Sequence, residues 1–534
     1  MVDMSSSSWT TSMMEAVSRP AIAGPLLLLA VWAVYRLFFQ PSALPDLPIV
    51  GARQGDWSPM WQARLRNFKD MKAALSSSYA QYPKQATILP LLDSGNIVLL
   101  PQSDTKFLAD QPDNVLNMHD QAQDSLQTDY TTMDPSLTHD PIHTNIIVGR
   151  LTKEIANLVP GLAEEIEYCF DRHLGTDPDF KEIGVYDSMQ QVLSGVTNRA
   201  LVGFPLCRDQ KVLDMGVAFA QDMPLSSMLL RCFPGFAKPL VAPLITLPNR
   251  IHTRKFEKLL APAIETRLQQ CGLRQDVHAS EKSDAPRHND FLQWSIEQAK
   301  AIGNPKNWQV SALAQRVLLL NFAAIHTSTF AMTHVLLDLA SAPPEIIEEL
   351  REEAANMLNE HDGQWSKRGL AQLEKLDSAM RESQRKNSFV GLGLMRKVVA
   401  QDGVTFPSGV HVRQGNSVCV PAYSVLQDSA VYTDPKMYKP LRFYEARVSE
   451  TEGYVKSARN AFPTASTDFL GWGLGRNACP GRFFASNEIK MMLAYLLLNY
   501  DIEHQESRPR NVWFGMNRIP PMKATLRMRK RATA

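Results

Sequence analysis

The chain has 534 residues, which is enough for one large domain with an appended segment or for three smaller domains. Its 56 lysines and arginines nearly balance its 55 aspartates and glutamates, so the charge gives no indication of a nucleic-acid-binding surface. The six cysteines show no C-x-x-C spacing, which argues against a disulfide-stapled fold and a structural zinc site and predicts a reducing compartment for the main body.

The N-terminal part of the chain predicts a membrane anchor. Residues 1–20 are rich in serine and threonine, and we expect a short disordered segment. Residues 21–39 are almost wholly apolar, and a helix of that length extends about 28 Å, close to the thickness of a bilayer's hydrocarbon core. Basic residues follow this segment and only Arg19 precedes it, which predicts one crossing with the C-terminal part in the cytoplasm. The alternatives are a buried helix or a cleaved signal peptide, which would make the protein soluble and secreted.

The next residues predict a hinge and then a small sheet. Residues 40–50 hold three prolines, which cannot continue a helix, so we expect a stiff hinge before one large domain over residues 51–534. Apolar runs at Ala86–Leu92 and Asn96–Leu100 predict two short strands.

A long helical region follows, from Ile146 to about Lys306, in which apolar residues recur mainly at helical spacing. It contains an apolar cluster with three interpretations: core, a membrane-contacting surface, or the wall of an apolar access channel. The members of this cluster are Met223, Leu225, Met228, Leu229, Leu230 and Phe233.

The residues from Val317 to Ala340 are apolar on nearly every side, which predicts a long buried helix. The middle of the helix breaks this pattern, because Ala324 is followed by His326 and Thr327 where only core residues are expected. Hydroxyl groups can bond to carbonyls one turn earlier and loosen a helix, and small residues let a planar ligand approach the backbone. Taken alone, the pattern is also that of a buried helix whose polar groups are satisfied by neighbours.

Further along, a helix is predicted from about Leu370 to Lys386, with Glu382 and Arg385 three residues apart on one face. Such a pair is usually a solvated ion pair of little energetic value. A Pro-x-Arg-Phe segment that contains Arg442 follows it.

The stretch Phe469–Ala485, FLGWGLGRNACPGRFFA, places one cysteine, Cys479, in a setting that ordinary packing does not require. Glycines at alternate positions before it permit positive φ and close approach of the backbone to a flat partner. These glycines are Gly471, Gly473 and Gly475. A long apolar helix is predicted after Pro480, which would put Cys479 at a helix N-terminus, where backbone N–H groups favour the metal-binding thiolate.

Two other interpretations of this stretch are weighed. One is a glycine-rich turn before a buried helix with a core cysteine. The other is a dinucleotide-binding loop, but its last glycine is misplaced, and Cys479 and Pro480 occupy the helix start where pyrophosphate would lie.

The stretch resembles the haem-binding loop of the cytochrome P450 family, in which an aromatic residue, glycines and a basic residue precede the cysteine that ligates iron. Trp472 takes the place of the usual phenylalanine. The residues that match the family's pattern are Gly473, Gly475, Cys479 and Gly481. Asn477 departs from it, because most members have Arg or His there to contact a haem propionate. Arg396, on a predicted strand, resembles the family's basic strand residue near a propionate and would partly offset Asn477.

The resemblance extends to the other motifs, in the family's order and at similar separations. Thr327 matches the distal-helix threonine that helps deliver protons to bound oxygen, with Ala324 as the small residue beside the haem. His326 replaces the usual acid, as in a subset of fungal members, and we expect it to share the proton route. In the family, a glutamate and two arginines brace the cysteine loop from behind, and these are Glu382, Arg385 and Arg442 here.

The resemblance implies a mainly α protein with a small β-sheet subdomain, the cytochrome P450 fold, preceded by one N-terminal transmembrane helix. It implies haem b held by Cys479, with electrons from NADPH through cytochrome P450 reductase, which would dock near Arg476, Arg482 and Lys490. It further implies O2 and an apolar small-molecule substrate, membrane lipid around a single-pass anchor in the endoplasmic reticulum, a cytoplasmic catalytic domain, and no nucleic acid.

The reaction that the resemblance implies is monooxygenation: hydroxylation, or multi-step oxidation, epoxidation or desaturation, of a fungal secondary metabolite such as a terpenoid. Two other functions stay open. The same fold could act as a reductase-independent isomerase or dehydratase, although Thr327 argues against this, or as a non-catalytic haem-binding or lipid-binding membrane protein.

Overall fold

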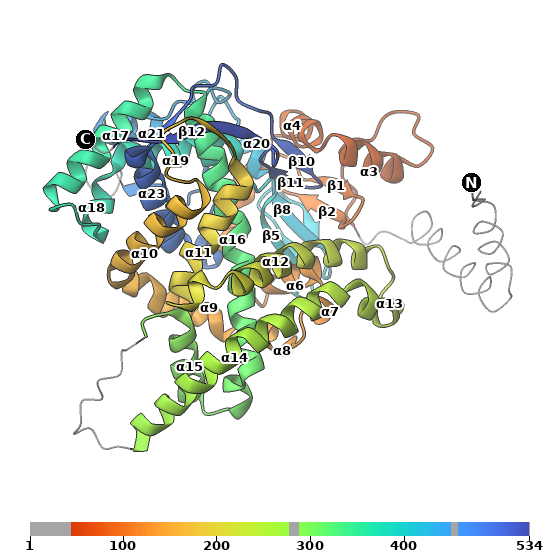
Figure 1. Ribbon diagram of the computed structural model, residues 1–534. Helices are drawn as coiled ribbons and strands as arrows, with labels where there is room; N and C mark the ends of the chain where they lie inside the picture. The colour runs from red at the N-terminus through yellow and green to blue at the C-terminus, as the bar shows by residue number, and fades with distance from the viewer. Residues whose placement is uncertain (1–43, 277–287, 450–457, 533–534) are drawn as a thin grey trace, which may run out of the picture.

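The computed structural model describes residues 44–276, 288–449 and 458–532. The predicted disordered N-terminus and membrane anchor, residues 1–20 and 21–39, lie outside these residues. The described part is mainly helical, and its largest sheet lies at one side of the helices (Figure 1). The end of the predicted hinge is paired with the sheet, because Val50 donates to Ile88 O (2.9 Å) and Ile88 donates to Pro48 O (2.9 Å).

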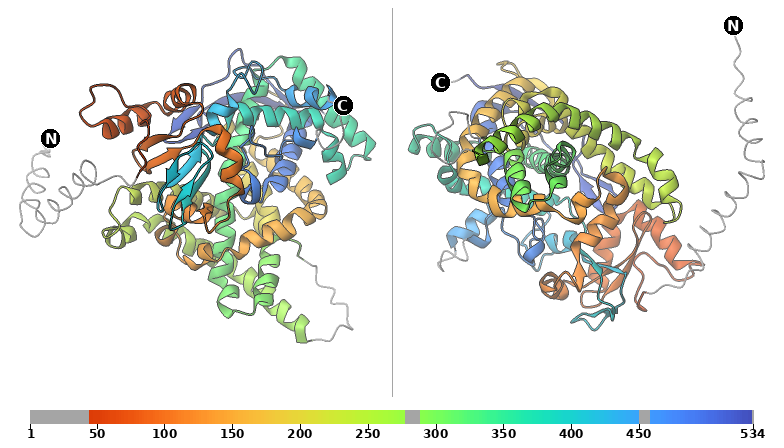
Figure 2. Two further views of the ribbon diagram at one scale, coloured as in Figure 1. Left: turned by 180° about the vertical axis from the view of Figure 1, so that it is seen from behind. Right: turned by 90° about the horizontal axis from the view of Figure 1, so that it is seen from below.

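The helical part is built around α16 (Val310–Ala340), which runs through the middle of the molecule (Figures 1 and 2). The helices that pack directly against it include α11 (Val185–Leu201), α12 (Gln210–Arg231), α14 (Leu247–Asp276), α15 (Phe291–Ile302), α17 (Pro344–Glu360), α19 (Glu374–Asn387) and α23 (Arg482–Asn499). Further helices of this part include α9 (Ile142–Ile146), α10 (Thr152–His173), α18 (Lys367–Gln372) and α21 (Arg442–Ser449). The predicted buried helix is therefore confirmed, and it begins seven residues earlier than expected, at Val310.

Within the described residues, only α16 is long and apolar enough to cross a membrane by length and composition. More than half of its most apolar window, 56%, is nevertheless buried inside the protein. Leu336, Leu337 and Leu339 in its C-terminal half are fully buried, and each such side chain contributes about 2 kcal/mol to the hydrophobic stabilisation. The packing of α16 is that of a core helix.

The largest sheet has five strands in the order β1-β2-β8-β5-β3. Its strands are β1 (Thr87–Leu91), β2 (Gly95–Leu99), β3 (Leu116–Asn117), β5 (Gly393–Val398) and β8 (Ser417–Val420). Only the β2–β8 pair is parallel, with Val98 opposite Val418. The two strands predicted near residues 86–100 are confirmed as β1 and β2.

One of the smaller sheets joins distant parts of the chain, and the other two are local hairpins. A three-stranded sheet is formed by β4 (Lys181–Gly184), β12 (Thr525–Lys530) and β9 (Tyr500–Ile502), and two hairpins by β6 (Val404–Thr405) with β7 (His411–Val412) and β10 (Val512–Phe514) with β11 (Asn517–Ile519). The C-terminal strand β12 thus lies beside the start of α11.

The prediction of one continuous helix from Leu370 to Lys386 is wrong. The chain forms α18 and α19 with a break at Leu373, whose backbone is non-helical (φ −76°, ψ 70°). A carboxylate from α17 stabilises the break, because Glu353 accepts from the backbone N–H groups of Lys375 (2.7 Å) and Leu376 (2.9 Å) at the start of α19.

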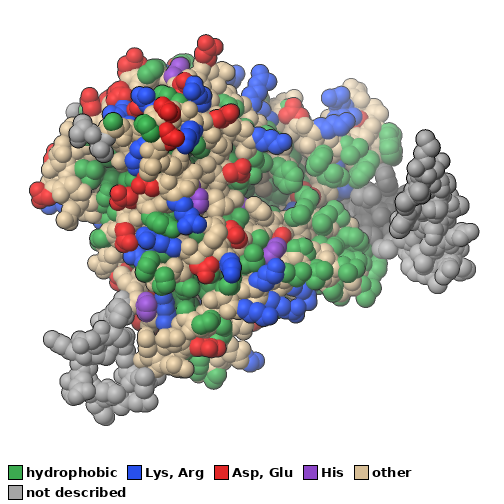
Figure 3. Space-filling model, in the orientation of Figure 1, with side chains coloured by type: hydrophobic (Ala, Val, Ile, Leu, Met, Phe, Trp, Pro, Cys, Tyr) green, Lys and Arg blue, Asp and Glu red, His purple; other side chains and the backbone are tan. Residues whose placement is uncertain are grey.

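The apolar cluster predicted between Met223 and Phe233 divides between core and surface. Met223 and Leu230 are buried, whereas the outward side chains belong to a larger apolar surface patch over the end of α12, α13 (Lys238–Ile245) and the start of α14. Figure 3 shows apolar side chains gathered on this side of the molecule. The residues of this patch are Leu225, Leu229, Phe233, Phe236, Leu240, Leu244, Leu247 and Ile251.

Candidate functional site

The loop before Cys479 is closed by backbone hydrogen bonds. Cys479 N donates to Trp472 O (2.7 Å), and Gly473 N donates to Leu470 O (3.0 Å). The turn requires positive φ at Gly473 (74°) and Gly475 (69°), and a Cβ at Gly475 would lie 3.0 Å from the carbonyl oxygen of Ala109. The alternating glycines therefore set the path of this backbone, as predicted.

Cys479 lies just before α23, not within it. The helix begins at Arg482, three residues later, with Gly481 at the N-cap, so the expected position at the helix start is only approximately right. Burial raises the pKa of the Cys479 thiol, while hydrogen bonds from the backbone N–H groups of Gly481 and Arg482 and the Arg482 charge oppose this rise. The sulfur thus faces donors that favour a thiolate, and a bound cation would complete that stabilisation.

Trp472 anchors the cysteine loop on the segment of this chain that contains Phe462. Its indole Nε1 donates to Phe462 O (2.8 Å), and the two rings meet edge to face with centroids 5.2 Å apart. Phe469, at the start of the loop, packs edge to face on Phe443 (6.2 Å). Aromatic contacts of this kind fix the loop against the body of the protein.

Glu382, Arg385 and Arg442 form a buried network, not a solvated ion pair. Glu382 and Arg385 are both 0% exposed, and Arg385 donates to the carboxylate through Nε (2.7 Å) and Nη2 (2.9 Å). Arg442 Nε donates to the same carboxylate at 3.0 Å. Arg385 also donates to Leu426 O (2.6 Å), and Arg442 donates to Thr433 O (2.6 Å). The predicted triad is therefore brought together, and it ties α19 to residues 426–442.

The contact between this network and the cysteine loop passes through residues that the sequence did not single out. Arg381, one position before Glu382, is buried with its guanidinium carbon 3.7 Å from the ring centroid of Phe469. It donates to Ala461 O (2.6 Å) and Thr464 O (2.7 Å), and burial lowers its pKa to about 10. Tyr432 adds a hydrogen bond from its hydroxyl to Asp468 O (2.9 Å). No spacing rule distinguishes these residues, because their partners come from other parts of the chain.

The middle of α16 leaves one face accessible although the helix lies in the interior. At about 100° per residue, the partly or fully exposed positions fall on one side of the helix, whereas most residues before and after them are buried. This accessible face consists of Leu319, Leu320, Phe322, Ala323, Ala324, His326, Thr327, Phe330 and Ala331. Ala323 and Thr327 are the most open of these positions, one turn apart, and their small size leaves room for a flat ligand.

Thr327 and His326 have separate partners. The Thr327 hydroxyl lies 2.8 Å from Ala323 O and 3.3 Å from Ala324 O, which is the back-bonding to the preceding turn expected of a mid-helix hydroxyl. His326 turns toward α11, where Tyr186 Oη lies 2.9 Å from its Nδ1, and burial lowers the pKa of its imidazole. Among the described residues, no hydrogen bond joins His326 to Thr327.

Arg396 on β5 is buried, with 4% exposure, and donates to the carbonyl of its neighbour Met395 (2.8 Å). Burial lowers its pKa to about 10, and the charge of Asp113 opposes this. Asn477 also donates to Asp113, through Nδ2 (3.3 Å). Arg396 and Asn477, which the sequence analysis connected with the haem propionates, therefore lie near the same aspartate. Within the described residues, Arg396 forms no ion pair, so its buried charge is available to an acidic group.

Among the buried nitrogens without a hydrogen-bond partner in the described chain is one of His143, which the sequence did not single out. Nδ1 of His143, in α9, has no hydrogen-bond partner within the described part of the chain. Burial and the charges of Arg316 and His119 lower its pKa to about 4, so the ring is a neutral donor or acceptor.

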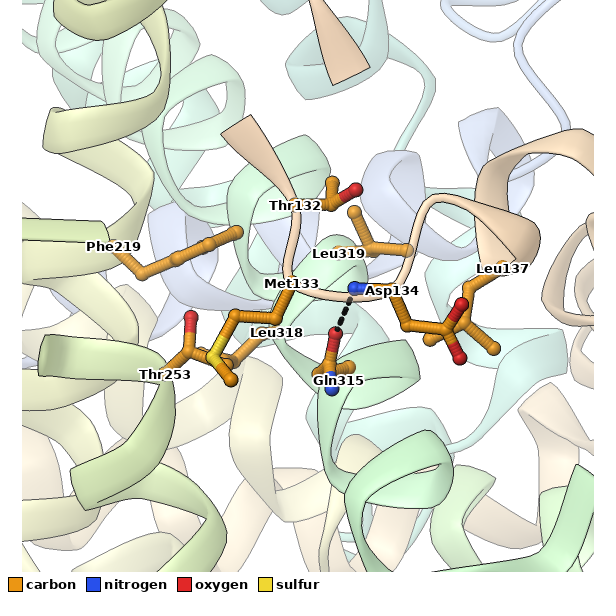
Figure 4. Close-up of a pocket in the computed structure, with 9 residues that line it drawn as sticks. All are labelled: Thr132, Met133, Asp134, Leu137, Phe219, Thr253, Gln315, Leu318 and Leu319. Carbon is orange, nitrogen blue, oxygen red and sulfur yellow. Dashed lines mark hydrogen bonds between the residues drawn. The ribbon is translucent and has the colours of Figure 1, made fainter. Parts of the chain in front are cut away.

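A small pocket lies at the N-terminal end of the accessible face (Figure 4). It is enclosed by the loop between α7 (Thr128–Thr131) and α8 (Ser136–His139) together with α12, α14 and α16. Gln315 closes one side by accepting from Asp134 N (3.0 Å). Leu319 lines this pocket and also belongs to the accessible face, so the two spaces adjoin along α16.

The basic residues near Cys479 do not share one surface. Arg476 is exposed and Arg482 is half-buried, but Lys490 is buried at 7% exposure. Its Nζ lies 2.6 Å from Asp377, which also accepts from Arg447 (2.6 Å). The prediction that Lys490 lies on a docking face is wrong, because α23 is covered on nearly all sides and the charge is paired inside.

Comparisons with known proteins agree with the motif order. The family model described as "Cytochrome P450" matches residues 105–524. Cytochrome P450 monooxygenase 151 of Postia placenta is 32% identical over 498 residues, which cover 93% of this chain and 96% of the relative. Cytochrome P450 monooxygenase gloP of Glarea lozoyensis is 31% identical over 86% of both chains, and cytochrome P450 monooxygenase astC of Aspergillus terreus is 28% identical over 99% and 100%.

Proposed function

Since this chain belongs to the cytochrome P450 family, whose members bind haem through a cysteine thiolate, we propose that Cys479 is the iron ligand of this monooxygenase. The observation that carries the proposal is the sulfur of Cys479 beside backbone N–H donors in a braced loop. The fully buried cysteines lack this setting. Burial strongly raises the pKa of Cys169 and Cys419, with no backbone donor to oppose it.

The other polar groups of the site fit the remaining parts of a haem. Arg396 is a buried cation that forms no ion pair among the described residues, although the charge of Asp113 acts on it, and Asn477 donates to the same Asp113. Ala324 belongs to the accessible face of α16, where small side chains leave room for a macrocycle. Trp472, Gly473, Gly475 and Gly481 shape the loop on the cysteine side, and in our proposal Glu382, Arg385 and Arg442 support it from behind through Arg381 and Tyr432.

Bound haem supplies the oxygen chemistry, and its thiolate ligand donates electron density that favours O–O cleavage. In our proposal, Thr327 holds water through its hydroxyl on the accessible face, and His326 supplies a second polar group at the edge of that face. The apolar side chains of the same face, such as Leu320, Phe322 and Phe330, exclude bulk water and select an apolar substrate.

We further propose that the substrate is a fungal secondary metabolite such as a terpenoid, oxidised in one or several steps. The fungal origin of the relatives and the apolar accessible face support this. For the redox partner that the family uses, we propose an NADPH–cytochrome P450 reductase that docks near Arg476 and Arg482.

The proposed location is the endoplasmic reticulum membrane, with residues 21–39 as the anchor, residues 40–50 as the connection and residues 51–534 as the cytoplasmic catalytic domain. The apolar surface patch over α12, α13 and α14 supports contact with lipid, because Leu240 and Leu244 are 80% and 78% exposed there.

The test is the spectrum of the ferrous carbonyl complex. The wild-type protein should show the red-shifted band of thiolate-ligated haem, and Cys479→Ser should lose it. Cys232→Ser changes an exposed cysteine and should leave the band unchanged. If the band persists in Cys479→Ser, the ligand assignment is wrong. Substrate-dependent NADPH consumption with reductase present then separates oxidation from reductase-independent isomerisation and from binding without turnover.

A further inference from the structure

His326 is held by two polar side chains of α11 at the edge of the accessible face. Tyr186 Oη lies 2.9 Å from His326 Nδ1, and Gln190 Nε2 lies 3.3 Å from the same nitrogen. Gln190 Nε2 also donates to Tyr186 Oη at 3.1 Å. Tyr186 and Gln190 are both buried, so three polar groups from two packed helices meet at one point.

The contacts of Gln190 favour one of the two nitrogens of His326 as the one that carries the proton. An amide nitrogen only donates, so both hydrogen bonds of Gln190 point away from it. Tyr186 Oη accepts from Gln190, which leaves its hydroxyl proton available to His326 Nδ1 (2.9 Å), the shorter of the two contacts to that nitrogen. Nδ1 is therefore an acceptor, and a neutral imidazole must carry its proton on Nε2.

The remaining nitrogen is left free to donate. Nε2 of His326 is buried and has no hydrogen-bond partner within the described residues. An unpaired buried polar group costs about 1–3 kcal/mol, so a hydrogen-bond acceptor that reaches Nε2 from outside the described residues would stabilise the site.

Aromatic contacts hold the ring from the side. Phe330, one turn after His326, lies with its ring centroid 6.3 Å from the imidazole and 5.8 Å from the ring of Tyr186. Phe389, just after α19, packs on the far side of Phe330 at 5.4 Å. The orientation of His326 is thus fixed by both hydrogen bonds and packing.

We propose that Tyr186, supported by Gln190, is a positioning residue for proton delivery: it holds His326 with Nδ1 as acceptor, so that Nε2–H is left as the free hydrogen-bond donor of a residue on the accessible face. This inference rests on the proposed monooxygenase site. It assigns to α11 a part in the reaction, and it gives the histidine that replaces the usual acid a defined protonation state.

The first test uses the diamagnetic ferrous carbonyl holoenzyme labelled with ¹⁵N-histidine, in which His326→Gln identifies the His326 signals. The wild-type ring should carry its proton on Nε2 with a hydrogen-bonded Nδ1. Tyr186→Phe keeps the packing on Phe330 and should shift the Nδ1 signal or mix the two tautomers. Tyr168→Phe, which removes an α10 hydroxyl bonded to Arg172 (2.7 Å), should change nothing. A wild-type ring protonated on Nδ1, or an unchanged signal in Tyr186→Phe, overturns the inference.

The second test measures the share of NADPH electrons that reach product instead of peroxide. Tyr186→Phe should lower this share several-fold while haem content and substrate affinity stay at wild-type values, and it should add nothing in a His326→Gln background. If Tyr186→Phe and wild type deliver the same share of electrons to product, the role of Tyr186 is refuted. The proposed haem site is not refuted by that result, because it is tested by the carbonyl band of the wild type. Absence of that band in the wild type refutes the proposed site itself.

Discussion

The buried carboxylate of Glu382 offers the sharpest test of how the cysteine loop is supported. It accepts four hydrogen bonds: from Arg385 Nε (2.7 Å) and Nη2 (2.9 Å), from Arg442 Nε (3.0 Å) and from Lys439 N (3.2 Å). Glu382→Gln keeps the shape of the side chain but removes its negative charge. It also replaces one carboxylate oxygen by an amide N–H donor, which then faces the N–H donors of the arginines. Arg385, fully buried, then has no counter-charge.

Removing one partner from a buried ion pair costs about 3–5 kcal/mol, a large share of the roughly 5–15 kcal/mol that stabilises a typical domain. We expect Glu382→Gln to lower the free energy of unfolding by that amount, measured by urea denaturation of the holoenzyme. The matched control is Asp110→Asn, which breaks the exposed pair with Lys106 (side chains 56% and 78% exposed) and should cost less than about 1 kcal/mol. If both variants lose the same small amount, the network does not carry the stability assigned to it.

Two further outcomes are expected. Burial raises the pKa of Glu488 to about 8 from 4.5, so the folded protein keeps a proton that the unfolded chain releases, and stability should fall as pH rises from about 4.5 to 8. In urea denaturation at pH 4.5 and pH 8, Glu488→Gln should not show this loss of stability and should be more stable than wild type at pH 8. The control Glu352→Gln changes an exposed glutamate and should match the stability of wild type at both pH values. Arg396→Met should weaken haem retention in competition with apomyoglobin without destabilising the haem-free protein, because it removes a buried cation with no ion-pair partner in the described chain. The control is Lys397→Met, at the neighbouring half-buried position, which should retain haem normally. Equal haem retention in the two variants contradicts the propionate role of Arg396.

The sequence was sufficient for features that depend on short segments. The alternating glycines predicted the loop before Cys479, because positive φ at Gly473 and Gly475 is a local requirement. The apolar run of α16 predicted a buried helix, and the small residues at its centre predicted the accessible face. The triad of Glu382, Arg385 and Arg442 came from the order of motifs along the chain, since spacing alone pointed to a solvated pair.

The features that sequence reasoning missed depend on partners far away in the chain. Lys490 looks like a surface cation until Asp377, more than a hundred residues earlier, is placed beside it. The break at Leu373 needs the carboxylate of Glu353 from α17, and no turn signal in residues 370–386 announces it.

The same reasoning explains why His326 could be noticed but not understood from the sequence. A histidine in an apolar helix has two possible protonated nitrogens, and the helix itself does not choose between them. The choice is made by Tyr186 and Gln190, one turn apart on α11, about 140 residues before it. His326 belongs to the site because it lies next to Thr327 in the sequence of α16. Its protonated nitrogen is set by the hydrogen bonds from α11. A substitution on α11 can therefore alter the chemistry on α16 without any change in the residues that face the ligand.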